Sequence, residues 1–308
     1  MEIKNYFYKN LLLIFIFFLL GFNLNSEILF TKNYYDYTNL YICNDDGNNI
    51  KQITDKKDSH IQYFDYMNET NSIVYQEYNY NKGIVFIKMK NIVNGDEEIL
   101  KKENSFFLYK PYLSDITSIP NTNYVLYTKA IDFSNTETIY LFDVNIKKSK
   151  KIISLKNIHS INCSTNGEFL VFVKDNEIFK MDINGKNLVQ LTNDNLIIEK
   201  KMPIFNTTDD FIYFIGREKI ENKENINPDE LPKYYYVYEL NLNRKTIKKL
   251  TVKKAKHFYY CLELKNNTTL LFSEFLNGKR NLSEFNIETG NEKIILESDT
   301  GIERISYF

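Results

Sequence analysis

Short runs of apolar residues alternate with polar turns along the chain from residue 27 onward. The clearest unit, IFKMDINGKNLVQLT at 178–192, reads as a strand, a polar turn and a second strand. The same order returns in LYICNDDGNNIKQIT (40–54), VFIKMKNIVNGDEEILK (85–101), IYLFDVNIKKSKKIIS (139–154), VYELNLNRKTIKKLT (237–251) and LSEFNIETGNEKIILE (282–297). Intervals of roughly 40 to 60 residues between such units are typical of a propeller or an array.

Further apolar runs precede each of these strand pairs. One set lies at 28–31, 72–77, 124–129, 169–174, 211–216 and 270–275. Before most of them comes a fourth run, at 61–67, 109–115, 159–164, 202–206 and 257–264. The pattern therefore predicts an all-β fold over residues 27–308, a six-bladed β-propeller whose blades are four-stranded and antiparallel.

The first unit lacks its fourth strand. The chain enters directly at 28–31, whereas an apolar-alternating segment, 303–308, is left over after the sixth unit. An open ring would expose two blade faces to water. We therefore predict that residues 303–308 pair with the 28–31 strand and close the ring.

The first 26 residues have a different composition. Lys4 and Lys9 precede an unbroken apolar run at 11–20, and a short polar stretch follows up to Ser26. This order is typical of a secretory signal peptide, and the apolar run is short for a membrane span. We expect cleavage after Ser26, which would leave no transmembrane domain; an uncleaved N-terminal anchor is the alternative.

Charge and cysteine content narrow the function classes. The formal net charge is −1 and acidic and basic residues are interspersed, so we expect no nucleic-acid partner. The lysine-rich stretch 245–256 is interpreted as protection of an exposed sheet edge. Because the three cysteines, Cys43, Cys163 and Cys261, fall in different repeats, we interpret them as small buried hydrophobes and not as a disulfide framework.

The repeat around 164–192 resembles that of TolB-type propellers, a WD40-like family. Its matching parts are STNGEFLVF at 164–172, IFKMD at 178–182, Asn184-Gly185, and Leu191-Thr192. The resemblance implies the propeller fold and a periplasmic or cell-envelope protein that binds partners. TolB carries an α/β domain before its propeller, for which there is no room between Ser26 and Ile28; a stand-alone relative is expected.

One long insertion interrupts the fifth repeat. Residues 217–233, REKIENKENINPDELPK, are charged and contain two prolines. We interpret the segment as a solvated loop, with a partner-binding loop as the alternative.

The three histidines, His60, His159 and His257, stand near the start of the innermost strand in alternate repeats. Alternate blades would bring them around one mouth of the channel, where three imidazoles could hold a divalent metal such as zinc. The simpler interpretation is that they occupy the same loop position and face solvent. We therefore name them as candidate channel-mouth binding residues, and expect no metal and no cofactor.

Recognisable catalytic motifs are missing from the sequence. We therefore assign no catalytic residues and expect an exported, non-enzymatic scaffold that binds a protein or peptide in the cell envelope. The alternative is a metal-dependent, lyase-like enzyme acting on a polysaccharide, centred on the three histidines. Oligomeric state and partner identity do not follow from the sequence.

Overall fold

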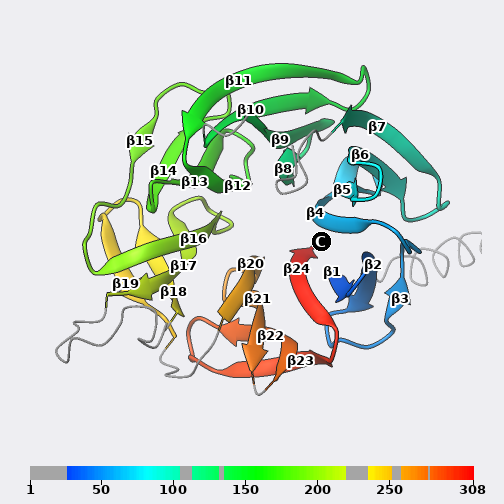
Figure 1. The fold of residues 1–308 in the computed structure, drawn as a ribbon. Coiled ribbons are helices and arrows are strands. Elements are labelled where there is room, and N and C mark those ends of the chain that lie inside the picture. Colours follow the sequence, from blue (N-terminus) through cyan, green and yellow to red (C-terminus); the bar gives the residue numbers. More distant parts are fainter. Residues whose placement is uncertain (1–25, 105–112, 132–134, 220–234, 252–257, 277) are drawn as a thin grey trace, which may run out of the picture.

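Six four-stranded antiparallel sheets stand in a ring around a central axis (Figure 1), as the sequence predicts. The computed structural model describes residues 26–104, 113–131, 135–219, 235–251, 258–276 and 278–308. The predicted signal peptide (apart from Ser26) and most of the fifth-blade insertion lie outside these residues. Within them, no helix is long and apolar enough to span a membrane.

Each blade runs outward from the axis in four steps. The innermost strands are β24 (Gly301–Tyr307), β4 (His60–Met67), β8 (Leu113–Ser118), β12 (Ile158–Cys163), β16 (Ile197–Phe205) and β20 (Phe258–Asn266). The second strands are β1 (Glu27–Tyr34), β5 (Ser72–Asn79), β9 (Tyr124–Ile131), β13 (Phe169–Lys174), β17 (Phe211–Glu218) and β21 (Thr269–Leu276).

The outer half of each blade consists of the strand pairs that the repeat predicts. The third strands are β2 (Tyr37–Asn44), β6 (Ile84–Asn91), β10 (Thr136–Asp143), β14 (Glu177–Asp182), β18 (Tyr235–Asn241) and β22 (Lys279–Asn286). The outermost are β3 (Lys51–Gln52), β7 (Glu97–Asn104), β11 (Lys148–Lys156), β15 (Val189–Gln190), β19 (Thr246–Lys249) and β23 (Glu292–Ser298). A short 3-10 helix, η1 (Asn68–Thr70), links β4 to β5.

The core is divided among the spaces between neighbouring blades. Six apolar clusters are found in the described residues, and each joins side chains of two adjacent sheets. Phe172 between blades three and four and Phe214 between blades four and five are both fully buried. Removing apolar surface from water is the main favourable term in folding, so each blade depends on both of its neighbours.

The closing threonine of the repeat has a defined structural role. Its hydroxyl accepts a hydrogen bond from the backbone N–H at the start of the third strand of the same blade, which satisfies a buried donor. The pairs are Leu40 to Thr54 (3.0 Å), Ile178 to Thr192 (2.9 Å) and Val237 to Thr251 (3.0 Å). In these three blades, the threonine of the repeated Leu-Thr or Ile-Thr pair therefore holds the chain that follows the outermost strand against the third strand.

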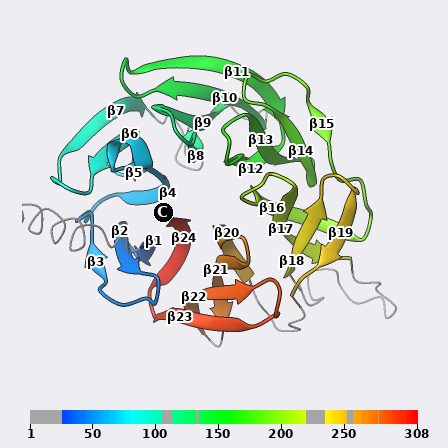
Figure 2. The same cartoon turned by 180° about the vertical axis from the view of Figure 1, so that it is seen from behind.

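The C-terminal strand closes the ring, as predicted. In β24, Ile305 is opposite Phe30 and Ser306 is opposite Leu29, so the last strand of the chain forms a sheet with the first. Both views show β24 between β1 and β20 (Figures 1 and 2). Ile302 and Ile305 add to the apolar cluster that joins blades six and one.

The structure confirms the prediction for the cysteines and corrects the prediction for the inner strand of blade three. The three cysteines are buried and unpaired, as interpreted. The inner strand expected at 109–115 extends further than expected, to Ser118. Residues 105–112 lie outside the described part, and β8 continues to Ser118 because buried Ile116 pairs opposite Tyr127.

We expect the ring to depend on the apolar contacts of β24. The Ile302→Ala substitution removes a fully buried side chain and should lower the free energy of unfolding by about 2–5 kcal/mol. The control Ile294→Ala, at a position that is 38% exposed on β23, should lower it by less than about 1 kcal/mol. Urea denaturation measures both.

Deleting residues 303–308 tests the closure more severely. We expect a lower thermal midpoint for the whole domain, because the loss opens a face on blade one and another on blade six. An unchanged midpoint would show that β24 does not close the ring.

Candidate binding site in the central channel

All six innermost strands carry a bulge where they pair with the second strand of their blade. A bulge adds one residue to a strand, increases its twist and redirects side chains. In β8, β12 and β16, the bulges place Asp115, Ser160 and Met202 in the left-handed region, at φ of 48°, 57° and 51°. A non-glycine residue keeps this left-handed conformation only where the surrounding structure imposes it, and here all three such residues line the channel.

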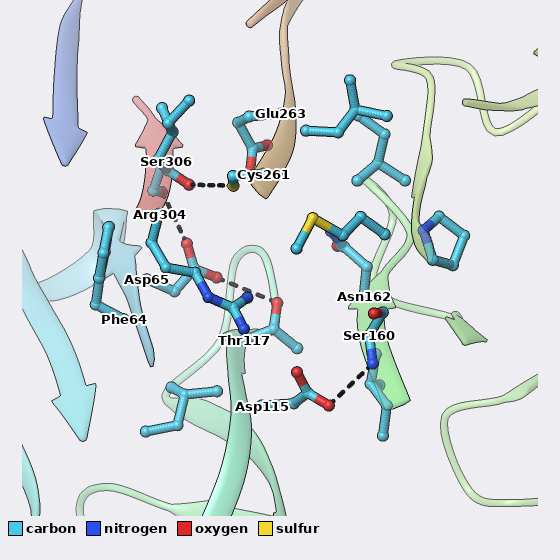
Figure 3. A pocket seen from close by; sticks show the side chains of 17 residues that line it. Phe64, Asp65, Asp115, Thr117, Ser160, Asn162, Cys261, Glu263, Arg304 and Ser306 are labelled. Atoms are coloured by element: carbon cyan, nitrogen blue, oxygen red, sulfur yellow. Dashed lines mark hydrogen bonds between the residues drawn. The ribbon is translucent and has the colours of Figure 1, made fainter. Parts of the chain in front are cut away.

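Just beyond the bulges, the inner strands contribute one residue each to a common level of the channel. Each of these residues is paired with a residue of the second strand, and in every blade that partner packs against the next blade. The six residues therefore occupy equivalent positions in their blades. This ring of residues lines a narrow, partly open cavity of about 100 Å³ (Figure 3). Its members are Asp65, Thr117, Asn162, Ile204, Glu263 and Ser306.

Asp65 joins three blades. Its Oδ1 accepts hydrogen bonds from the Tyr66 N–H at 2.8 Å and from the Ser306 hydroxyl at 3.0 Å. Its Oδ2 accepts from the Ser118 N–H at 2.7 Å, the Ser118 hydroxyl at 2.9 Å and the Thr117 hydroxyl at 3.2 Å. With five donors around it, this carboxylate is a structural tie between blades one, two and three.

Asp115 and Arg304 form a second charged group at the level of the bulges. Asp115 Oδ2 accepts a hydrogen bond from the Ser160 N–H at 3.0 Å (Figure 3). Burial raises the pKa of Asp115, and the nearby Arg304 guanidinium partly opposes that rise. The guanidinium carbon of Arg304 lies 4.1 Å from the centroid of the Tyr63 ring, a cation–π distance. Its backbone N–H donates to Thr31 Oγ1 at 3.2 Å.

Glu263 has far fewer partners than Asp65. Within the described residues, its hydrogen bond is a long one, 3.3 Å from the Leu264 N–H to Oε1. Burial first, and then the charge of Asp65, raises the pKa of Glu263 to about 8. The carboxyl is therefore mostly protonated at neutral pH. The cavity lining holds three carboxyl groups, Asp65, Asp115 and Glu263, against the guanidinium of Arg304.

A wider groove of about 580 Å³ opens on the face where the inner strands begin, over blades one, two and six. We call this side the entry face; it carries the β1–β2 turn. Tyr35, in that turn, is 99% exposed, and Tyr80 is 42% exposed. At the rim, Arg280 Nη1 bonds Glu303 Oε1 at 2.6 Å. Glu303 precedes Arg304 in β24, so one strand lines both the groove and the channel cavity.

The structure separates the two described histidines. His60 lies in the groove, where its Nδ1 is 3.0 Å from Thr38 Oγ1 and its ring meets Tyr80 edge-on at 5.0 Å. His159 is paired opposite Val173, deeper along its strand, and its Nδ1 is 3.0 Å from Ser160 Oγ.

Burial lowers the pKa of both histidines. No group of three metal-binding side chains occurs within the described ranges. His257 lies outside them, so the three-histidine metal site stays a prediction.

The channel residues belong to no known motif, but the sequence does contain a signal for them. Each charged residue interrupts an apolar inner strand: Asp65 in FDYM, Asp115 in LSDIT, Glu263 in CLEL and Arg304 in IERIS. An isolated charge within an apolar strand needs a partner or a ligand. The sequence does not reveal the bulges, which direct these residues into the channel.

Comparison with known proteins supports the architecture. The family model described as "Dipeptidyl peptidase IV (DPP IV) N-terminal region" matches residues 120–215. The structure of TolB from Acinetobacter baumannii aligns with a TM-score of 0.68 at 14% identity, covering 92% of this chain and 66% of TolB. The chain has a TolB-like propeller fold. It spans just under two thirds of the length of that TolB chain.

Two further solved structures share the fold. A chain of a nidogen/laminin complex aligns with a TM-score of 0.66 at 10% identity, covering 92% of this chain and 98% of the other. An oligogalacturonate lyase in complex with manganese aligns with a TM-score of 0.60 at 10% identity, covering 89% and 75%. A search of curated proteins found no match. At these identities the likeness establishes fold, not function.

We expect Glu263 to make stability depend on pH. Its pKa is about 8 in the folded protein and about 4.3 in an unfolded chain. Between these values the unfolded chain has already released the proton, so the contribution of Glu263 to stability falls as pH rises and levels off above about pH 8. The Glu263→Gln variant lacks this loss. Its stability relative to wild type should increase by on the order of 3 kcal/mol from about pH 5 to 8.5.

Urea denaturation at several pH values measures this difference. The exposed control Glu288→Gln makes the same chemical change at the surface, far from the channel cavity. A pH-independent difference for Glu263→Gln would mean that Glu263 titrates as an ordinary surface carboxyl.

Proposed function

We propose that this chain is an exported, TolB-like propeller that binds a protein or peptide in the cell envelope and catalyses no reaction. The observation that carries the proposal is the tyrosine-rich groove on the entry face. It is far larger than the channel cavity, about 580 Å³ against about 100 Å³, and the two are lined by consecutive residues of β24.

The composition of the groove suits a protein interface. Tyrosine and arginine are enriched at the energetic centres of such interfaces, because they combine large contact area with hydrogen-bonding groups. Tyr34, Tyr35, Tyr80 and Arg280 all line the groove. Tyr35 leaves almost its whole side chain in water, so the ring is accessible to a binding partner.

The groove is also held in a fixed shape. The Tyr34 hydroxyl is 3.1 Å from that of Tyr41, Gln62 Nε2 donates to the Tyr80 hydroxyl at 3.2 Å, and Asn33 Nδ2 donates to Glu303 at 2.8 Å. A preformed surface loses little conformational entropy on binding.

Two solved structures with this fold add support, since one is TolB and another comes from a complex of nidogen with laminin. The apolar run at 11–20, with Lys4 and Lys9 before it, supports export. Together, these two observations support a periplasmic or cell-envelope location.

We expect partner contacts to concentrate at the groove. A photoreactive phenylalanine analogue at position 35 or 80, introduced in the native cells, should cross-link to a defined envelope protein. The same analogue at position 124 is the control, because Tyr124 is a partly exposed tyrosine at the opposite face. With the purified partner, Tyr35→Ala should weaken binding about tenfold or more, since exposed aromatic anchors often contribute over 1.4 kcal/mol.

Equal labelling from positions 35 and 124, or an affinity unchanged by both Tyr35→Ala and Tyr80→Ala, would remove the groove as the binding surface.

The second candidate function is a metal-dependent enzyme acting on a polysaccharide. The structural likeness to a manganese-bound oligogalacturonate lyase and the placement of His60 among groove tyrosines favour it. The two described histidines do not share a cavity, so no reaction step can be assigned to them.

Metal analysis of the purified protein, followed by manganese and zinc titration, tests this candidate. A bound metal whose affinity falls at least about tenfold in His159→Ala would support it. Absence of bound metal, or binding unaffected by His159→Ala, would exclude it.

A further inference from the structure

The channel cavity has an excess of acidic groups whose partners are unevenly distributed. Asp65 is surrounded by five hydrogen-bond donors from three blades. Asp115 has the Ser160 N–H and the charge of Arg304. Among the described residues, Glu263 accepts one hydrogen bond, the long one from the Leu264 N–H, and it lines the same cavity (Figure 3).

The lining of the cavity is mainly polar but also has an apolar part. Around the charged groups lie apolar side chains from different blades, among them Phe64, Ile161, Ile204 and Leu262. A flexible apolar stem that ends in a positive charge matches this lining: its methylene groups contact the apolar side chains, and its charged end reaches the carboxyl groups.

We infer that the channel is a binding site for the side chain of a lysine residue presented by a peptide, with Glu263 as the ammonium acceptor and Asp65 adding to the attraction. The inference rests on the proposed function, since the lysine belongs to the partner, but it concerns a different set of residues from the groove.

Three features favour lysine over other cations. The ammonium donates up to three hydrogen bonds from one atom, so it fits a narrow cavity more easily than a planar guanidinium does. The space in the cavity, about 100 Å³, is small. Although three carboxyl groups line the cavity, no three metal-binding side chains of the described residues are grouped so that they could hold a metal ion.

The charge of Glu263 responds to such a ligand. An ammonium beside the carboxyl favours its ionised form, so a group that is largely protonated in the empty channel becomes the counter-ion of the bound lysine. Binding is therefore best measured at about pH 8.5, where the free carboxyl is already substantially ionised and lysine keeps its charge.

The test compares two capped tripeptides, acetyl-Gly-Lys-Gly-amide and its norleucine analogue, which has a similar apolar stem and no charge. Isothermal titration or NMR at about pH 8.5 should show the lysine peptide binding with a Kd of about 1 mM or tighter, and the norleucine peptide at least about tenfold more weakly.

Variants then locate the site. Glu263→Gln should weaken binding of the lysine peptide about tenfold and leave the norleucine peptide unaffected, because it removes only the charge. Glu263→Asp, which keeps the charge on a shorter side chain, should restore part of the affinity. The surface control Glu288→Gln should bind like wild type. Thermal melting confirms that each variant is folded.

Tyr35→Ala should leave tripeptide binding unchanged, which separates this inference from the proposed function. Equal affinity for the two peptides, or lysine binding that survives Glu263→Gln in a folded protein, would overturn the lysine site. In that case cross-linking at positions 35 and 80 would still decide the proposed function. Conversely, lysine binding without cross-linking would uphold the channel site and remove the groove.

Discussion

The pairing of β24 with β1 is the interaction on which the rest of the structure depends. A ring of blades has no free faces only if its ends meet, and here they meet through the last seven-residue strand of the chain. Its buried isoleucines, Ile302 and Ile305, fill the space between blades six and one. Because each blade is stabilised mainly by its neighbours, a loss of contacts between blades six and one destabilises the whole ring.

The same strand carries much of the chemistry of the channel. Ser306 donates to Asp65 of blade two, Arg304 supplies the guanidinium of the cavity, and Glu303 bonds Arg280 at the groove. Closure therefore does more than bury apolar surface. It completes both the hydrogen bonding of Asp65 and the charge pattern of the site, so an unclosed ring would lose its binding surfaces together with its stability.

The fold could be predicted from the sequence because its signals are local and repeated. Alternating apolar residues define the strands, and the Thr54, Thr192 and Thr251 hydroxyls make the same contact in three blades. Even the closure followed from one strand missing at the start and one left over at the end.

The candidate site could not be predicted in the same way, because it arises from contacts between distant residues. Asp65 and Ser306 are 241 residues apart, and only the closed ring brings them to 3.0 Å. The bulges added a second obstacle. His60 and His159 occupy similar places in the repeat but different registers in the ladder, a difference that an alignment of the repeats does not reveal.

What distinguishes Glu263 from Asp65 is the number of neutral donors around each, not the type of residue. Both carboxyls stand at the same level of the channel. Five hydrogen bonds stabilise one carboxylate in place, and a carboxylate so surrounded has little to gain from a ligand. A carboxyl with a single long bond is costly to ionise in the empty channel, and for that reason it gains most from an arriving cation. The difference in hydrogen bonding between the two residues therefore distinguishes their roles: Asp65 stabilises the fold, and Glu263 remains available to a partner.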